Sequence, residues 1–240
     1  MKKYITIGLL LILATYSLWQ ISRSTSFQLF GEIVASVDTT EKIVAITFDD
    51  GPWNIKYTTD VIQTLDSLNV KATFFLNGRG IEQNFDAAKN LVLAGHQIGN
   101  HGYSHQRLVF KGFDTVKNEI ESTNALIREI GYENDIYFRP PYGSKLFVLP
   151  YYLKQHDITT VTWDLAPETF DGAGQTSSYI SNTVIENAVP GSIILLHVLG
   201  SGNSQAREAL KPIVEGLRAK GFRFVTLSEL LGKKTSSTVS

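Results

Sequence analysis

The sequence contains no cysteine in its 240 residues. This absence excludes disulfide bonds, thiolate metal ligands and cysteine nucleophiles, so any metal ion must be held by His, Asp or Glu. It also suits an oxidising compartment. The net charge is also close to zero, because 22 Lys and Arg residues nearly balance 23 Asp and Glu residues. A chain without a positive excess lacks the broad positive field of nucleic-acid-binding surfaces, and we expect no nucleic-acid partner.

Charged residues make up only 19% of the chain, against 43% hydrophobic residues. This composition is typical of a globular protein with a substantial core, and it excludes a disordered chain. One or two domains fit the length.

The first 22 residues are predicted to be a membrane anchor or an export signal. Lys2 and Lys3 precede 19 uncharged residues, Tyr4 to Ser22, and Arg23 follows. That length approaches the roughly 20 residues that cross a bilayer, which favours a retained anchor over a cleaved signal peptide. The excess of positive charge before the stretch places the remaining chain outside the cytoplasm. We therefore expect a cell-membrane protein with its main domain outside the cytoplasm, or a secreted or periplasmic protein if the segment is cleaved.

Composition also predicts the domain boundaries. Residues 1–22 are the anchor or signal, and residues 23–40 are a linker, rich in Ser and Thr, that includes one short strand. Residues 41–231 form the main domain, and residues 232–240 are a tail.

Short apolar runs alternate with amphipathic segments in the main domain, which predicts parallel strands joined by crossover helices. The expected strands are 43–48, 72–76, 97–101, 136–139, 158–163, 192–197 and 222–227. Helical spacing predicts helices around 61–68 and 116–130, and Gly95, Gly131 and Gly221 follow such segments, where glycine ends helices. The pattern indicates an α/β fold, either an open doubly wound sheet or a small barrel.

Polar residues gather at the ends of these strands, where both folds place their sites. Asp49 and Asp50 leave the first strand within TFDDGP. Adjacent side chains leaving a strand point to different sides, so one carboxylate can hold a metal while the other faces a substrate. An aspartate turn without a chemical role is the alternative.

Two histidines follow the third strand. His101 and His105 are four residues apart in HGYSH. Together with one carboxylate they can form a three-ligand metal site with an open coordination position. A pair of solvated loop histidines is the alternative interpretation.

The later strands end in three further clusters. RPPYG, residues 139–143, contains two prolines that lack N–H groups, so the amide of Tyr142 has few local competitors. WDLAPETF, residues 163–170, combines acidic and aromatic residues, and His197 ends the apolar run IILLH. Without a chemical role, RPPYG would be a rigid turn, WDLAPETF a packed loop and His197 a buried core histidine. Burial would also suit His197 to acid chemistry. His96 and His156 are interpreted as surface residues.

In this order, TFDDGP, HGYSH, RPPYG, WDLAPETF and LLH resemble the five motifs of the polysaccharide deacetylases, the carbohydrate esterase family with the NodB homology domain. The resemblance spans about residues 41–231, and TFDDGP with RPPYG is its most specific part. It implies a distorted (β/α)7 barrel of the NodB-homology type, here preceded by the N-terminal membrane helix.

The resemblance also implies roles for individual residues. It makes Asp50, His101 and His105 the ligands of a divalent metal, most readily zinc, with cobalt or nickel as alternatives. It makes Asp49 the catalytic base and His197 the general acid.

The remaining roles concern positioning and substrate contact. By the same matching, Arg139 orients Asp49, the backbone amide of Tyr142 contributes to the oxyanion hole, and Leu195 lines the acetyl pocket. Aromatic faces for a sugar ring could come from Trp53, Tyr103, Tyr142 and Phe170, which a structural role would explain equally well.

The chain departs from the family pattern at two motifs. Gly102 stands where the second motif has Ser or Thr, which removes a hydroxyl that would brace the loop. Thr169 and Phe170 stand where the fourth motif has Asp and Trp, so Arg139 loses its expected partner. We expect Glu168, one residue earlier and one methylene longer, to replace that partner.

The metal is expected to contribute the largest share of catalysis. A zinc-type ion lowers the pKa of water from 15.7 to about 7, which is worth roughly 12 kcal/mol at 1.36 kcal/mol per pKa unit. Together with the metal site, the resemblance implies a metal-dependent hydrolase that removes acetyl groups from N-acetylated sugars of a cell-envelope polysaccharide, such as a peptidoglycan- or chitin-like polymer.

Three alternatives remain open from the sequence. The substrate could be a lipid-linked sugar or an O-acetylated polymer. The protein could be a glycan-binding protein that lost turnover through its altered fourth motif. An iron oxygenase would also use two histidines and a carboxylate, but the strand and helix alternation and RPPYG give it little support. The oligomeric state is unknown.

Overall fold

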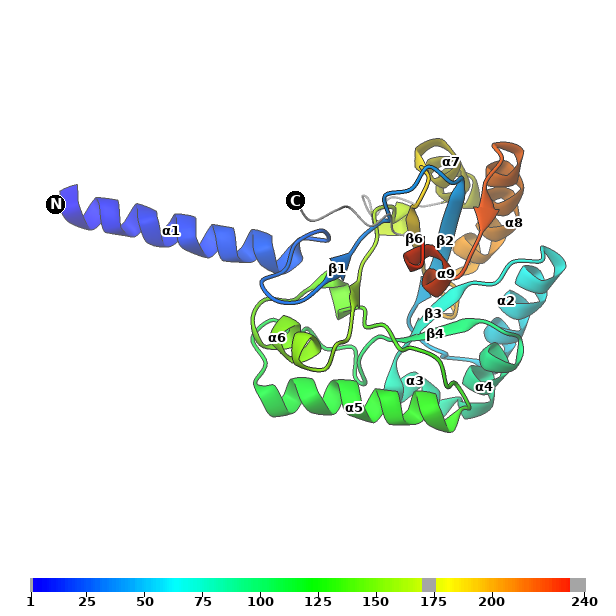
Figure 1. The fold of residues 1–240 in the computed structure, drawn as a ribbon, viewed down its shortest axis with the longest axis horizontal. Coiled ribbons are helices and arrows are strands. Elements are labelled where there is room, and N and C mark those ends of the chain that lie inside the picture. The colour runs from blue at the N-terminus through cyan, green and yellow to red at the C-terminus, as the bar shows by residue number, and fades with distance from the viewer. Residues whose placement is uncertain (1, 170–175, 234–240) are drawn as a thin grey trace.

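The computed structural model describes residues 2–169 and 176–233. Helix α1 (Lys2–Arg23) projects away from the rest of the chain (Figure 1). Within these ranges, no helix combines the length and the apolar character needed to cross a membrane. The predicted membrane helix is thus present as a helix, but its membrane-spanning role is not confirmed and stays a prediction.

Parallel strands form the centre of the main domain. The strands of the described residues are β1 (Ile33–Val34), β2 (Ile43–Asp49), β3 (Thr73–Leu76), β4 (Gln97–Asn100), β5 (Thr160–Val161), β6 (Ile193–Leu196) and β7 (Arg223–Phe224). Four of them follow the order β4-β3-β2-β6, with β7 also paired to β2. All of these pairings are parallel, as the alternation of strands and helices predicted.

Single bridging residues extend this sheet toward a ring. Phe138 bridges Asn100 on one side and Thr160 on the other, and Leu165 bridges Ile194 of β6. The strand predicted over 136–139 is reduced to this bridge because the two prolines that follow have no N–H to donate to a ladder. The arrangement fits the distorted barrel implied by the resemblance.

The sheet begins inside the predicted linker. The short strand expected there is β1, and it pairs with β5 in the register Ile33 to Thr160 and Val34 to Val161. Val34 and Val37 are buried in the core. Part of the linker is therefore built into the domain.

Helices cover the outer faces of the strands. Those of the main domain are α2 (Ile55–Ser67), α3 (Gly78–Gln83), α4 (Phe85–Leu93), α5 (Phe113–Glu129), α6 (Val148–Gln155), α7 (Ser177–Asn187), α8 (Ser204–Ala219) and α9 (Leu227–Leu231). Two short 3₁₀ turns, η1 (Pro141–Gly143) and η2 (Pro167–Thr169), follow the fourth and fifth apolar runs. Figure 1 shows α2, α4 and α8 on one side of the strands and α6 on the other. The glycines predicted to end helices, Gly95, Gly131 and Gly221, all have positive φ after α4, α5 and α8.

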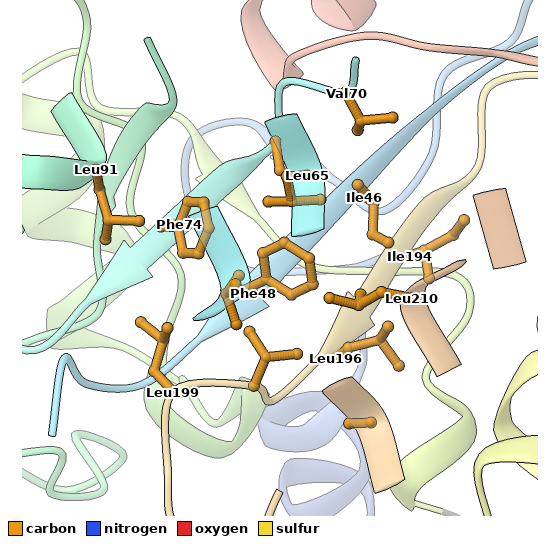
Figure 2. Close-up of a cluster of buried hydrophobic side chains, with 14 of the residues drawn as sticks. Ile46, Phe48, Leu65, Val70, Phe74, Leu91, Ile194, Leu196, Leu199 and Leu210 are labelled. Atoms are coloured by element: carbon orange, nitrogen blue, oxygen red, sulfur yellow. The ribbon is translucent and has the colours of Figure 1, made fainter. Parts of the chain in front are cut away.

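The largest core cluster lies between β2, β3, β6 and the helices beside them (Figure 2). Phe48 and Phe74 pack there with ring centres 4.9 Å apart. Alternate residues of β2 fall into two clusters, Phe48 in this one and Ala45 in another, so the strand is buried on both faces. A strand held on both faces gives the two aspartates at its end a rigid base.

The structure corrects one interpretation of the sequence. His96 is not a surface residue: it is buried against Phe74, with ring centres 5.1 Å apart. Burial, together with the nearby charge of Lys71, lowers the pKa of His96 to about 4. His156, in contrast, is exposed as predicted.

Candidate active site

The predicted site residues meet at the carboxyl ends of the strands. Asp49 ends β2, His101 follows β4, and His197 follows β6. Because β2, β4 and β6 are parallel members of one sheet, their carboxyl ends lie on the same edge. Ion-pair distances of 3.7 to 4.0 Å then link the histidine Nε2 atoms to the aspartate pair.

A potential metal site lies within this group. The ligand atoms of Asp50, His101 and His105 all lie within 4.8 Å of one another. Oδ1 of Asp50 is 3.4 Å from Nε2 of His105 and 3.9 Å from Nε2 of His101. This oxygen is buried and accepts no hydrogen bond from the described residues. A buried carboxylate oxygen facing two imidazole nitrogens fits a divalent cation, because it would otherwise remain unsatisfied.

Neighbouring groups orient His101 and favour the neutral form of His105, as metal ligation requires. Nδ1 of His101 lies 2.8 Å from the carbonyl oxygen of Arg139. Donation of Nδ1–H to that carbonyl leaves the lone pair of Nε2 facing Asp50, as in most metal-binding histidines. Burial, reinforced by repulsion from His101, lowers the pKa of His105 and favours its neutral, ligating form.

Glu119 of α5 braces the loop between the two histidines. Its Oε2 accepts the backbone N–H groups of Tyr103 and Ser104 at 2.8 and 2.9 Å. Its Oε1 accepts the Ser104 hydroxyl and the Gln106 amide at 2.6 and 2.7 Å. Gly102 sits beside this carboxylate with φ +75, and a Cβ there would lie 3.3 Å from Oε2. The loop is thus braced by a carboxylate from another helix, whereas the sequence indicated that a bracing hydroxyl was lost.

Arg139 holds Asp49 as the resemblance implied. Its Nη1 donates to Oδ1 of Asp49 at 2.6 Å and to the Thr47 hydroxyl at 2.8 Å, while its Nη2 donates to the Thr162 carbonyl at 2.8 Å. Burial acts to raise the pKa of Asp49, but the charge of Arg139, with those of His101 and His197, outweighs burial and holds the pKa below its usual range. Asp49 is therefore ionised at neutral pH.

Glu168 has a different partner from the one predicted. Its Oε2 lies 2.7 Å from Nδ1 of His197 and accepts the His197 backbone N–H at 2.8 Å. The expected pairing of Glu168 with Arg139 is therefore corrected, because the guanidinium is already occupied by Asp49, Thr47 and main-chain carbonyls.

His197 is correspondingly basic. Burial alone would lower its pKa, but the hydrogen bond that the ring donates to Glu168 and the charges of Asp49, Glu168 and Asp50 raise the pKa to about 9. Asp49 and His197 thus have pKa values displaced in opposite directions within one site. Such a separation is what an acid–base pair needs, with one group ionised as a base and the other protonated as an acid.

Tyr142 presents a free backbone amide. Its φ of 59° lies in the left-handed region, as do those of Asp50 at 74° and His105 at 59°. Non-glycine residues with this conformation are uncommon and gather at functional sites. Among the described residues, no protein group accepts a hydrogen bond from the Tyr142 N–H. The amide is therefore available to a bound ligand.

The other predicted contact residues have mixed outcomes. Leu195 is buried on β6 two residues before His197, so strand alternation directs both to the same face. Trp53 is partly exposed beside the aspartate turn. The Tyr103 hydroxyl is tied to Glu82 at 2.6 Å. The side chain of Thr169 and the whole of Phe170 lie outside the described residues.

Two asparagines that the sequence analysis did not single out connect the site loops. Asn77 accepts the Gly51 N–H at 3.1 Å and donates to the His101 carbonyl at 3.2 Å, which joins the aspartate turn to the histidine loop. Asn100 accepts the Gly102 N–H at 2.7 Å. Both asparagines are buried, Asn77 directly after β3 and Asn100 as the last residue of β4, and this position at a strand end is a signal which sequence reasoning could have used.

Comparison with known proteins agrees with the resemblance found in the sequence. The family model described as "Polysaccharide deacetylase" matches residues 36–161. A peptidoglycan-N-acetylglucosamine deacetylase from Bacillus cereus is 35% identical over 204 residues, covering 85% of this chain and 95% of the relative.

Solved structures extend the similarity to the fold. The Bc1960 peptidoglycan N-acetylglucosamine deacetylase, in complex with 4-naphthalen-1-yl-N-oxidanyl-benzamide, superposes with a TM-score of 0.76 at 34% identity, covering 82% of this chain and 91% of that one. A CE4 family pseudoenzyme from Bacillus anthracis superposes with a TM-score of 0.75 at 26% identity, covering 84% and 69%.

Proposed function

Because this chain belongs to the polysaccharide deacetylase family, we propose that it is a metal-dependent hydrolase that removes acetyl groups from N-acetylated sugars of a cell-envelope polysaccharide. One observation carries the proposal: an ionised Asp49 and a protonated His197 flank the group of Asp50, His101 and His105. An amide hydrolase needs these parts, namely a base for water, an acid for the leaving amine and a site for a Lewis acid.

Asp50, His101 and His105 would hold the metal ion. Three protein ligands with nitrogen and oxygen donors suit zinc, with cobalt or nickel as alternatives, and leave a coordination position open. A divalent ion at this position would polarise the acetyl carbonyl and acidify a neighbouring water.

Asp49 acts as the general base. Arg139 keeps the carboxylate ionised and engages its Oδ1 at 2.6 Å. Oδ2 faces the three proposed metal ligands and lies 3.7 Å from Nε2 of His101. It accepts a proton from the attacking water. The main-chain contacts of Arg139 hold this pair in place as the substrate binds.

Tyr142 stabilises the charge that develops on the acetyl oxygen. Its free N–H is held by the 3₁₀ turn η1, so it needs no reorganisation to donate a hydrogen bond to the oxyanion. Loss of one such donor typically costs about 3 to 4 kcal/mol of transition-state stabilisation.

His197 completes the reaction as the general acid. Glu168 holds the ring through Nδ1, which leaves Nε2 directed toward the aspartate pair, 4.0 Å from Oδ2 of Asp50. The protonated Nε2 gives its proton to the departing amine nitrogen as the carbon–nitrogen bond breaks. Acetate and a free amino sugar are the products.

The substrate we propose is peptidoglycan, with N-acetylglucosamine as the sugar that loses its acetyl group. The support is the similarity to the Bacillus cereus relative of that name over most of both chains. Leu195 would form an apolar wall for the acetyl methyl group, and Trp53 would offer a ring face to a sugar. A lipid-linked sugar and an O-acetylated polymer are the competing substrates in the test below.

We also propose that the enzyme is exported, with residues 1–22 as its anchor or signal. One support is that the proposed substrate lies outside the cytoplasm. The other is the exposed apolar side chains along α1, among them Leu9, Leu11 and Leu13. Fractionation of cells tests this location. Recovery of the chain with washed membranes supports an anchor, recovery in the medium or periplasm supports cleavage, and recovery in the cytoplasm contradicts export.

Acetate release by the metal-loaded full chain tests the activity. We expect release from N-acetylglucosamine oligomers and peptidoglycan, loss of release on chelation, and recovery on addition of zinc. Asp50→Asn should abolish both stoichiometric zinc binding and turnover, whereas Asp135→Asn, an exposed aspartate remote from the site, should alter neither.

Two outcomes would contradict the proposal. Zinc binding with acetate release only from lipid-linked or O-acetylated substrates would refute the substrate. Zinc and glycan binding without acetate release from any of them would favour a glycan-binding protein, as the similarity to a pseudoenzyme allows.

A further inference from the structure

A pocket lies beside the turn η1, where the end of α1 meets residues 107–111, the loop after the metal-site histidines. Its volume is about 600 Å³, within the range of small-molecule sites. Its lining includes Trp19, Arg23, Arg107, Phe110, Lys111 and Ser144. It is therefore built from three segments that are remote in sequence.

The pocket carries only positive charge. Arg23, Arg107 and Lys111 line it, and none of its lining residues is acidic. Across the described ranges, no carboxylate lies within ion-pair distance of any of these three cations. Clustered cations without acidic partners repel one another, and an anion bound among them would relieve that repulsion.

Arg107 connects the pocket to the proposed active site. Its guanidinium carbon lies 3.9 Å from the ring centre of Tyr142, and its Nη1 donates to the Ser144 hydroxyl at 2.9 Å. The Tyr142 ring in turn lies 4.6 Å from the ring of His105. Two ring contacts therefore separate a pocket cation from a proposed metal ligand, which places the pocket next to the proposed active site.

Hydrogen bonds hold the end of α1 and the residues directly after it against the main domain. The backbone N–H of Lys145 donates to the Ser22 carbonyl at 2.9 Å, and its Nζ donates to the Ser24 carbonyl. The Thr162 hydroxyl donates to the Thr25 carbonyl at 2.5 Å. These bonds give the pocket a defined shape beside Tyr142.

We propose that this pocket is a subsite for an anionic group, carried by the glycan beside the sugar that loses its acetyl group. Arginine and lysine would bind the carboxylate or phosphate oxygens, and Trp19 and Phe110 would contact the apolar faces of the attached sugar or peptide. The inference rests on the proposed function, because it assigns the pocket to the same substrate.

Neutralising two pocket cations tests the subsite. The variant Arg23→Gln/Lys111→Gln leaves Arg107 and its contact with Tyr142 in place. We expect KM for a peptidoglycan disaccharide–tetrapeptide, which carries carboxylates, to rise about tenfold with kcat unchanged. KM for the neutral N-acetylglucosamine tetramer should stay constant, and high salt should remove the difference between the enzymes. Lys89→Gln on α4, far from α1 in Figure 1, is the matched control.

Calorimetry with the metal-free full chain in uncharged detergent gives a second measurement that needs no turnover. We expect the double variant to bind the disaccharide–tetrapeptide about tenfold more weakly than the wild type. Equal losses for charged and neutral glycans, or no loss for either, would overturn the subsite. Loss of binding to phosphatidylglycerol vesicles alone would also overturn it and assign the pocket to lipid headgroups. Turnover of the neutral tetramer reports separately on the proposed function.

Discussion

Replacement of Glu168 by glutamine tests how the site keeps His197 protonated. The side chain of Glu168 is largely buried, and one of its oxygens accepts both the ring Nδ1–H and the backbone N–H of His197. The amide oxygen of glutamine can accept the same two bonds. Glu168→Gln therefore removes the negative charge and preserves the orientation of the ring.

The size of the effect follows from the hydrogen bonds. A bond to a charged group contributes about 1.5 to 3 kcal/mol and a neutral one about 0.5 to 1.5, a difference of roughly 1 to 1.5 kcal/mol. At 1.36 kcal/mol per pKa unit, the pKa of His197 should fall by about one from its value of about 9.

The Glu168→Gln substitution should lower activity at high pH and leave it nearly unchanged at neutral pH. A general acid works only while protonated, so the activity that depends on His197 is lost as pH rises through its pKa. A pKa lowered by about one leaves the ring mostly protonated at pH 7, so activity there should change little. In the metal-free protein at pH 9 the protonated fraction should fall about fivefold, because it drops from about one half to about one tenth.

Titration of the His197 ring by NMR in the metal-free protein would measure this shift. Rate profiles from pH 6 to 10 on the zinc-loaded enzyme should show the alkaline limb displaced in the same direction. Glu133→Gln, an exposed glutamate remote from the site, is the matched control. Glu168→Leu should in addition lose activity at pH 7, because the ring then has no acceptor to orient it. An alkaline limb that stays in place in Glu168→Gln, or equal losses at pH 7 and pH 9, would refute the assigned role of Glu168.

Three further predictions concern the scaffold of the site. Glu119→Gln should weaken zinc binding about tenfold in a chelator competition, because it loosens the loop that carries both histidines, and an affinity equal to that of Glu133→Gln would contradict the bracing role. Gly102→Ser should destabilise the fold by about 1 to 2 kcal/mol relative to Gly202→Ser, which stands at an open position, and lower Tm by about 2 to 4 °C per kcal/mol. Equal melting curves for the two variants would show that the strain is absent. Removal of residues 2–35 should lower the unfolding midpoint in urea more than removal of residues 2–21, because only the longer deletion removes β1 from its pairing with β5; equal midpoints would contradict a structural role for β1.

Most of the fold and the main site residues could be predicted from local patterns. The alternation of strands and helices was predicted from helix and strand periods, from glycine at helix ends and from polar residues at strand ends. All of these patterns depend on residues that are neighbours in the sequence. The predicted aspartates and histidines of the metal group meet because parallel strands bring their carboxyl ends to one edge.

Position in the fold decided which polar groups pair. Glu168 is adjacent in sequence to the altered fourth motif, and motif spacing suggested Arg139 as its partner, yet it binds His197, 29 residues away. Glu119 lies 15 and 16 residues beyond the two backbone amides that it braces, on a helix with no motif of its own. No local period encodes such distances, since they depend on how α5 and η2 pack against the sheet.

The sequence by itself therefore determined the identity of the chemical groups, their order along the chain and the edge of the sheet on which they stand. The tertiary structure alone decided which carboxylate serves which partner, that β1 pairs with β5, and that the end of α1 and the loop after the histidines enclose a positive pocket. The physical reason is that periodicity and turn chemistry are local properties. Hydrogen bonds, ion pairs and pocket walls instead join residues whose separation in the chain only folding removes.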